Sequence, residues 1–322
     1  MTLLGKLLKP LFEVSQKDVP SFPEDDNWTI QRLKTVIFTV TECCHITLKN
    51  SRFEVLVPRL DAYEDELRGF AYEGAGVGLA ALDCLLPWKK RTRAFVDGPG
   101  SPYIFAVYLG AGMALARIHR QPEPFRTRLE DPVFSWVVMD GYGFHEGFFA
   151  RRRYVEERAV PMHLSSYARR AFDHGLGRSI WFSAGANVDR VVSTIAAFAP
   201  ARHADLWSGV GLACGYTGGV DRPTIETLQT AVGPHRSQLA LGVVIAAKAR
   251  QQVGNPASHN EIACEVLCGL SSKEASHLAD LALQNLPTDG VEPAYEIWRQ
   301  RIEAQFAVPA EGGLRSETSL VQ

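Results

Sequence analysis

The sequence predicts an all-α fold, an α-solenoid-like array of helical hairpins that repeat about every 33 residues. Gly-x-Gly pairs recur 31 to 36 residues apart along most of the chain. They stand at Gly74/Gly76, Gly110/Gly112, Gly141/Gly143, Gly175/Gly177 and Gly209/Gly211, and Ala240/Gly242 continues the series. Each pair lies in apolar helical sequence, and a second helical pattern separates it from the next. The architecture is tetratricopeptide-like in period, although the tetratricopeptide signature is absent.

Glycine inside a helix costs about 1 kcal/mol relative to alanine. Glycines at matched positions of successive repeats therefore indicate a gain from close approach. The approach is either helix against helix or backbone against ligand, and we favour helix packing.

Residues 1–28 read as a lead-in with a short amphipathic helix, whose apolar stripe is Leu4, Leu7, Leu8 and Leu11. This stripe fits docking on the protein's own body, which we favour, or lying on a membrane surface. Residues 29–308 form one helical-repeat domain. The tail, 309–322, is rich in Gly, Ser, Glu and Thr, and we expect it to be disordered.

Within the domain, TVIFTVTECC suits a strand or a buried helix, because its β-branched residues fit both. Gly and Pro predict a loop from Arg91 to Pro102 and a break at 121–132. Later helices have clear starts: Asn187 as an N-cap, Asp221 before Pro223, and a capping box of Ser271 with Glu274.

Composition excludes several classes of protein. A net charge of −2 argues against a broad nucleic-acid-binding face. The six cysteines lie in apolar stretches without C-x-x-C spacing, which indicates reduced core residues and a cytoplasmic protein. No segment has the apolar length of a membrane span, although association through a partner or the N-terminal helix stays open.

No cofactor motif is evident, so the cofactor stays unknown. GAGVGLA at 74–80 lacks the buried strand that a dinucleotide-binding loop requires. His259 with Cys264 and Cys268 is better explained by buried cysteines than by a metal site, and we expect no metal.

The densest polar cluster in apolar surroundings is DGYGFHEGFF, residues 140–149. Asp140, His145 and Glu146 supply acid–base groups, and Tyr142 supplies a phenol. Adjacent His145 and Glu146 diverge by about 100° on a helix, so at most one of them shares a site with Asp140. The alternative is a set of buried hydrogen-bonding residues that tie the repeats together.

The next repeat places Asp173, His174, Arg178 and Trp181 at comparable positions. Acidic residues recur just before the glycine pairs, beginning with Glu73, and stacked repeats would line them along one groove or cavity. The candidate catalytic residues are therefore Asp140, His145, Glu146, Asp173 and His174. The candidate substrate-binding residues are Tyr72, Tyr108, Tyr142, Arg178, Trp181, Trp207 and Tyr216, whose aromatic members would also serve as plain core.

Six blocks in order resemble the UnbL-type family, a family of unknown function encoded in bacterial enediyne antibiotic clusters. They are GFAYEGAGVGLAALD, YLGAGMALARI, DGYGFHEGFF, ARRAFDHGLGRSIWF, ADLWSGVGLACGYTGG and EIACEVLCG, and the resemblance runs from about residue 25 to residue 305. It implies a role in maturing the enediyne core beside a polyketide synthase, an integral membrane protein and an accessory protein. It carries over no catalytic residues.

From this resemblance we expect a protein that binds or acts on a linear conjugated polyene, a hydrophobic small molecule, during its conversion to the alkyne-containing core. Alkyne formation is a net oxidation, so a partner or cofactor must accept electrons. The alternatives are a non-catalytic scaffold that assembles the biosynthetic proteins and a self-resistance protein that sequesters the finished enediyne.

Overall fold

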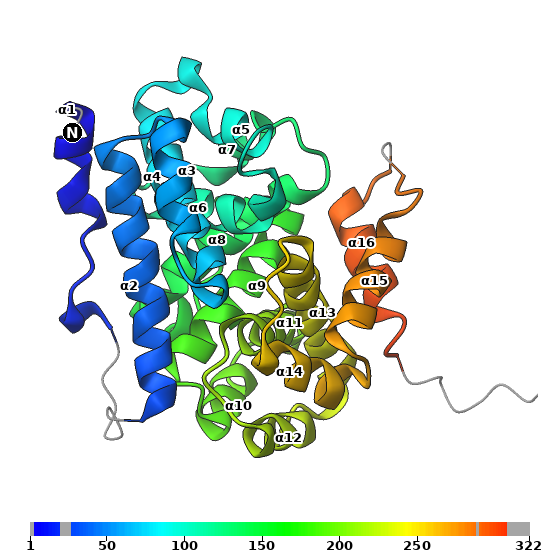
Figure 1. The fold of residues 1–322 in the computed structure, drawn as a ribbon. Coiled ribbons are helices and arrows are strands. Elements are labelled where there is room, and N and C mark those ends of the chain that lie inside the picture. The colour runs from blue at the N-terminus through cyan, green and yellow to red at the C-terminus, as the bar shows by residue number, and fades with distance from the viewer. Residues whose placement is uncertain (1–2, 20–26, 288–289, 308–322) are drawn as a thin grey trace, which may run out of the picture.

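A computed structural model of the chain describes residues 3–19, 27–287 and 290–307 (Figure 1). Within those ranges every regular element is a helix and no strand occurs, which confirms the all-α prediction. The ambiguous segment TVIFTVTECC is helical and lies inside the longest helix, α2 (Trp28–Lys49). The predicted disorder of the tail concerns residues 309–322, which lie outside the described residues.

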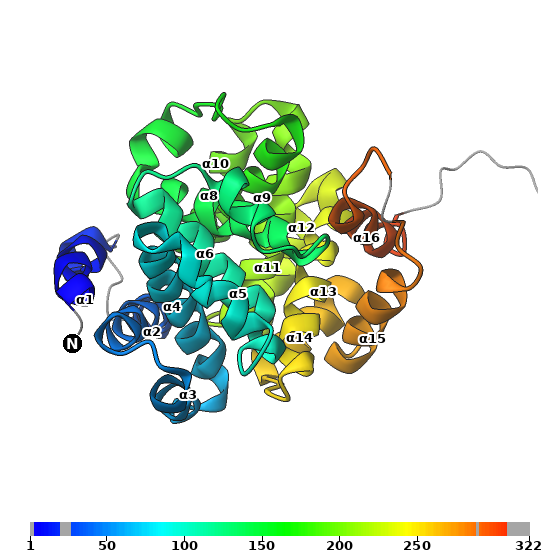
Figure 2. The same ribbon diagram turned by 90° about the horizontal axis from the view of Figure 1, so that it is seen from above.

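The core helices pack in one row that follows the chain, each against the next (Figure 2). The row consists of α2, α4 (Asp65–Leu85), α6 (Ile104–Arg117), α8 (Val137–Phe149), α9 (Ser166–Ser183), α11 (Pro200–Thr217), α13 (Arg236–Gln252) and α15 (Ser272–Leu283). Along the chain, shorter helices connect the core helices: α3 (Phe53–Asp61), α5 (Arg91–Val96), α7 (Pro122–Thr127), α10 (Val188–Ala196), α12 (Arg222–Ala231) and α14 (Ser258–Cys268). The chain begins with α1 (Leu3–Leu8) and η1 (Lys9–Phe12), and α16 (Ala294–Glu303) packs on α13 and α15.

The glycine pairs lie where neighbouring core helices meet. A Cβ on the first glycine of a pair would overlap the carbonyl oxygen of the residue that precedes the previous pair: Gly110 meets Glu73, Gly175 meets Asp140, and Gly209 meets His174, each at 1.9 Å. The second glycine meets a carbonyl of the following helix, as Gly112 does at 2.0 Å from Val138. Helix-against-helix approach therefore accounts for these glycines, as favoured from the sequence.

The row curves back on itself, so that its middle and late helices meet the start of α4. The Phe70 ring on α4 contacts Tyr216 on α11, with ring centroids 5.1 Å apart. The Asn255 amide donates to the Asp65 carbonyl (2.8 Å), and Arg32 Nε on α2 donates to the Thr217 carbonyl (2.9 Å). This curvature encloses an interior lined by side chains of helices far apart in sequence.

The predicted loop from Arg91 to Pro102 is wrong in its first half, where α5 forms. The Asp83 carboxylate on α4 accepts hydrogen bonds from the backbone N–H groups of Arg91 (2.9 Å) and Thr92 (2.8 Å). These groups are at the start of α5 and have no partners within a helix. The predicted break at 121–132 likewise contains a short helix, α7, which begins at Pro122.

The predicted helix starts are confirmed. Asn187 caps α10, Asp221 caps α12, and Ser271 with Glu274 forms the capping box of α15. At the N-terminus, Leu8 and Phe12 are buried against the body, whereas Leu7 and Leu11 are 65% and 50% exposed. The segment therefore docks on the protein, although part of its apolar stripe stays outside.

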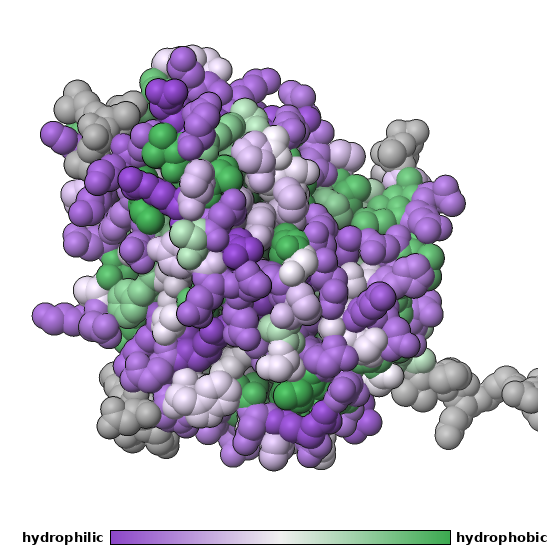
Figure 3. Space-filling model, viewed as in Figure 1, coloured by the Kyte–Doolittle hydropathy of each residue, from purple (hydrophilic) through white to green (hydrophobic). Residues whose placement is uncertain are grey.

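None of the described helices is long and apolar enough by itself to cross a membrane, and the bent pair Asp65–Leu85 and Pro87–Val96 passes only on length and composition. The face in Figure 3 is mostly hydrophilic, with apolar side chains in scattered groups. The cysteines are free, and four of the six are buried.

Candidate functional site

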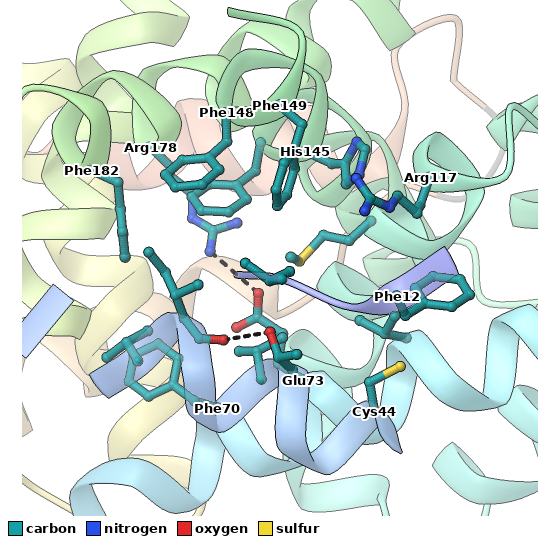
Figure 4. A pocket seen from close by; sticks show the side chains of 18 residues that line it. Phe12, Cys44, Phe70, Glu73, Arg117, His145, Phe148, Phe149, Arg178 and Phe182 are labelled. Atoms are coloured by element: carbon teal, nitrogen blue, oxygen red, sulfur yellow. Dashed lines mark hydrogen bonds and ion pairs between the residues drawn. The ribbon is translucent and has the colours of Figure 1, made fainter. Parts of the chain in front are cut away.

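An apolar cavity, here the first cavity, lies between the N-terminal segment and helices α2, α4, α6, α8 and α9 (Figure 4). Its volume is about 70 Å³, within about 690 Å³ of empty space that includes an opening to solvent. Six phenylalanines surround it: Phe12, Phe70, Phe144, Phe148, Phe149 and Phe182. Valines, an isoleucine, a methionine and a cysteine complete the apolar wall. A cavity with such walls suits an apolar ligand.

The positions of the glycine pairs in the sequence indicate why these side chains meet. The residue directly after each glycine pair lines the first cavity in four successive core helices: Val77, Met113, Phe144 and Arg178. The residues one helical turn later in the last three of these helices, Arg117, Phe148 and Phe182, line it as well. Residues four apart lie on one face of a helix, so the curved row presents equivalent faces to a common interior.

A buried glutamate and a buried arginine lie side by side in the lining of this cavity. Figure 4 shows Glu73 from α4 and Arg178 from α9 reaching toward each other, with Phe148 and Phe182 near Arg178. An Arg178 nitrogen lies 3.8 Å from a Glu73 oxygen, and both residues are buried. Burial raises the pKa of Glu73 to about 7, an effect that Arg178 only partly offsets and Asp140 reinforces. Glu73 is therefore poised to gain or lose a proton near neutral pH.

Asp140 on α8 holds Arg178 more tightly than Glu73 does. It accepts a hydrogen bond from Arg178 Nη1 (2.8 Å) and one from His174 Nδ1 (2.6 Å). Burial alone would raise the pKa of Asp140, but Arg178 and His174 outweigh it and leave that pKa below its ordinary value. Asp140 is accordingly the anionic anchor of the cluster, and it fixes both neighbouring side chains.

A smaller second cavity shares Glu73 and Arg178 with the first as lining residues. Its volume is about 30 Å³ within about 510 Å³ of empty space, and its walls come from α4, α6, α8, α9, α11, α13 and α16. Glu73 and Arg178 line both cavities, while Asp140 and Tyr216 line only the second. Two apolar spaces thus share one charged boundary.

His145 on α8 lines the first cavity near Arg117. Burial lowers its pKa, so the imidazole is neutral at pH 7. Neither ring nitrogen has a hydrogen-bond partner, and its nearest carboxylate oxygen, from Glu146, is 3.7 Å from Nδ1. A buried imidazole with two unused nitrogens provides a donor and an acceptor for a ligand.

Of the twelve residues proposed from the sequence, five meet around this interior: Asp140, His145, His174, Arg178 and Tyr216. Asp173 instead pairs with Arg202 of α11 (2.5 and 2.8 Å). Tyr72 stacks on Tyr103 and donates to Asp61. The others, Tyr108, Tyr142, Glu146, Trp181 and Trp207, are buried but line neither cavity.

The expected apolar wall is thus built mainly from phenylalanines, which the sequence reasoning did not select. Phe144 and Phe148 are four residues apart in GFHEGFF, a spacing that places both on one helix face. Glu73 appeared in the recurring acidic series but was not among the candidate catalytic residues. Its position directly before a glycine pair matches that of Asp140, and this was the available signal.

His259 does not assemble with Cys264 and Cys268: its Nε2 lies 3.1 Å from the Tyr216 carbonyl. In the described part of the chain, no group of three or more His, Cys, Asp or Glu side chains is arranged to hold a metal ion.

Comparison with known proteins identifies a family but no activity. Residues 3–306 match the family described as "Protein of unknown function (DUF1702)", and the chain belongs to it. No curated protein and no solved structure matches the chain.

Proposed function

We propose that this member of the family binds a linear conjugated polyene in the first cavity and takes part in converting it to an alkyne-containing enediyne core. The observation that carries the proposal is an apolar, phenylalanine-lined cavity whose lining includes a buried Glu73–Arg178 pair. The resemblance to the UnbL-type family of enediyne clusters supplies the substrate class.

The cavity chemistry suits this substrate. A polyene has no charge to neutralise and gains from burial of its apolar surface, by about 25 cal/mol per Å². Aromatic walls pack well against a flat conjugated chain. Among its few polar groups, Glu73, Arg178 and His145 provide defined positions for proton transfer.

The residues account for proton movement but not for electron transfer. Glu73, with a pKa near neutrality, would exchange a proton with a carbon of the bound chain, and Arg178 would stabilise its anionic form. Converting an alkene to an alkyne releases two protons and two electrons, so an acceptor must take the two electrons and the proton that Glu73 does not accept. We therefore place this chain beside a redox partner among the membrane and accessory proteins of the cluster.

The repeated glycine contacts also support the interpretation of the core as an α-solenoid-like repeat. In such an array, equivalent positions line one continuous interior surface. The proposed binding site is that surface.

Binding is tested first with diphenylhexatriene, a neutral conjugated polyene that fluoresces only in apolar surroundings. We expect saturable fluorescence with the wild type and at least tenfold weaker binding in Thr41→Trp, because Thr41 lines the cavity. Thr35→Trp, on the exposed side of α2, is the matched control and should bind normally. Equal binding by all three proteins would refute the site.

Transformation is tested by the absorbance of a long polyene mixed with the protein, alone and then with the candidate partners. Bleaching or a new chromophore supports chemistry on the chain. In a producing host, Glu73→Gln and His145→Ala should then abolish product while the proteins stay folded and partner-bound. Glu146→Ala, which alters a residue outside both cavities, should have the smaller effect.

The two alternatives predict other results. A scaffold would tolerate His145→Ala and Glu146→Ala with unchanged production. If the chain is a self-resistance protein, a sensitive host that expresses it alone would survive the finished enediyne.

A further inference from the structure

We propose that the first and second cavities are two arms of one binding channel for a linear, uncharged, apolar molecule that lies across the Glu73–Arg178 pair. This inference rests on the proposed function, since it extends the ligand beyond the first cavity. It assigns the second cavity to the same ligand and the charged pair to its middle.

The boundary between the cavities is made of side chains, because α4 and α9 are separated in the row by α6 and α8. Glu73 and Arg178 line both spaces, so both cavities extend to this pair. Beside them, Phe70 of the first cavity touches Tyr216 of the second, with ring centroids 5.1 Å apart. A partition of side chains can open by rotation, whereas packed backbones cannot.

Arg178 is also held more firmly than Glu73. Arg178 is fixed by a 2.8 Å hydrogen bond to Asp140, while its nitrogen stays 3.8 Å from Glu73. Moving Glu73 aside therefore leaves Arg178 with its main partner. Glu73 is the movable half of the boundary.

The residues that line the second cavity are of the kind expected if it continues the first cavity. Its walls include Phe105, Leu109, Val137, Leu212 and Ile245, and its charged groups, Glu73, Asp140 and Arg178, lie in the cluster at the boundary. Residues directly before the glycine pairs, Glu73, Leu109 and Asp140, line it, one turn before those that line the first cavity. The same helix faces thus continue from one cavity into the other.

A ligand long enough to use both arms should bind more tightly with each added double bond. The probes are diphenylbutadiene, diphenylhexatriene and diphenyloctatetraene, which share their ends and differ only in length. We expect about fivefold tighter binding per added double bond in the wild type, from the apolar surface buried. Corrected fluorescence titration, with each probe kept below its solubility limit, measures the three Kd values.

Ala249→Leu narrows the second cavity from α13 at a half-buried position. It should cancel the gain from length while changing the affinity of diphenylbutadiene by less than about twofold. Ala204→Leu, half-buried on α11 but lining neither cavity, is the matched control and should keep the gain. Should Ala249→Leu fail to fold, Ala213→Val narrows the same cavity from α11.

The outcomes separate the two proposals. Failure of every probe to bind the wild type overturns the polyene site and this inference together. Binding without a length gain, or a gain that survives in the variants that narrow the second cavity, overturns the channel alone. A gain lost in those variants and retained in Ala204→Leu supports it.

Discussion

Glu73 and Arg178 lie close together but differ in their other partners. Arg178 has Asp140, a carboxylate that stays ionised, whereas Glu73 is buried among apolar side chains on α4. Burying a charge without a close partner favours the neutral form. Glu73 is consequently the residue whose charge changes near neutral pH.

Glu73→Gln should change how stability depends on pH. The pKa of Glu73 is about 7 in the folded protein against an ordinary value of 4.5, so the folded state holds a proton that the unfolded state releases between those values. The free energy of unfolding of the wild type, relative to that of the glutamine variant, is therefore highest below pH 4.5. It falls by on the order of 3 kcal/mol as the pH rises to 7.

Urea unfolding at several pH values measures this difference. Glu226→Gln, at an exposed position of α12, is the control and should show no such trend. A difference between wild type and Glu73→Gln that stays constant from pH 4.5 to 7.5 would contradict the assigned protonation.

Which residues could be predicted depended on whether their role is visible along the chain. Asp140, His174 and Arg178 stood out because charged side chains in apolar sequence need partners. Tyr72 and Trp181 were chosen instead as aromatic residues that could wall a cavity, yet Tyr72 stacks on Tyr103 and Trp181 is buried without lining either cavity. An aromatic residue contributes to core and cavity wall alike, so only the three-dimensional arrangement separates the two.

At the scale of elements, the glycine pairs set the distance between core helices. A side chain at the first glycine would collide with backbone of the neighbouring helix, which cannot move aside as a side chain can. The helices must then separate or shift along their whole length.

Gly110→Ala should therefore destabilise the fold despite the better helix propensity of alanine. The added Cβ would lie 1.9 Å from the Glu73 carbonyl oxygen, so overpacking exceeds the gain of about 1 kcal/mol in propensity. We expect a net loss of about 2 kcal/mol or more in chemical unfolding. Gly98→Ala, at an exposed turn whose nearest atom is 3.2 Å away, should change stability by less than about 0.5 kcal/mol.

The N-terminal segment closes one side of the first cavity. Phe12 and Val14 line the cavity, and Arg117 of α6 donates to the carbonyls of Leu11 (2.5 Å) and Glu13 (3.3 Å). A short segment held by few contacts opens more readily than the packed row.

Phe12→Ala should speed the release of diphenylhexatriene by about tenfold, which corresponds to a barrier to release that is lower by about 1.4 kcal/mol. Leu11→Ala is the control, because the Leu11 side chain is half exposed and lies outside the cavity lining. Stopped-flow displacement gives both rates. Equal rates for the two variants would mean that the probe leaves by another route.

Over the whole molecule, the sequence was informative about contacts between successive core helices and less so about how their row closes. The glycine spacing predicted these contacts because each one joins core helices that follow one another along the chain. The curvature depends on pairs such as Phe70 with Tyr216, or Asn255 with the Asp65 carbonyl, which no periodic pattern reveals. Helix α5 was missed for a similar reason, since its first backbone N–H groups donate to Asp83 of the preceding core helix.

A ligand in this interior should leave a distinctive pattern of hydrogen exchange. The first cavity draws residues from α2, α4, α8 and α9, so bound diphenylhexatriene should slow exchange in segments that are distant in sequence, while α10 and α12, outside the cavity lining, keep their local opening rates. Ligand binding also raises the free energy of global unfolding, by about 2.7 kcal/mol at a free ligand concentration of a hundred times Kd. Exchange rates should therefore be compared for amides that exchange by local opening. With diphenyloctatetraene, the slowed segments should extend to α11 and α13, which line the second cavity. Protection confined to α10 and α12 would instead mean that the probe binds the outside of the row, and the interior would then have no part in recognising the polyene.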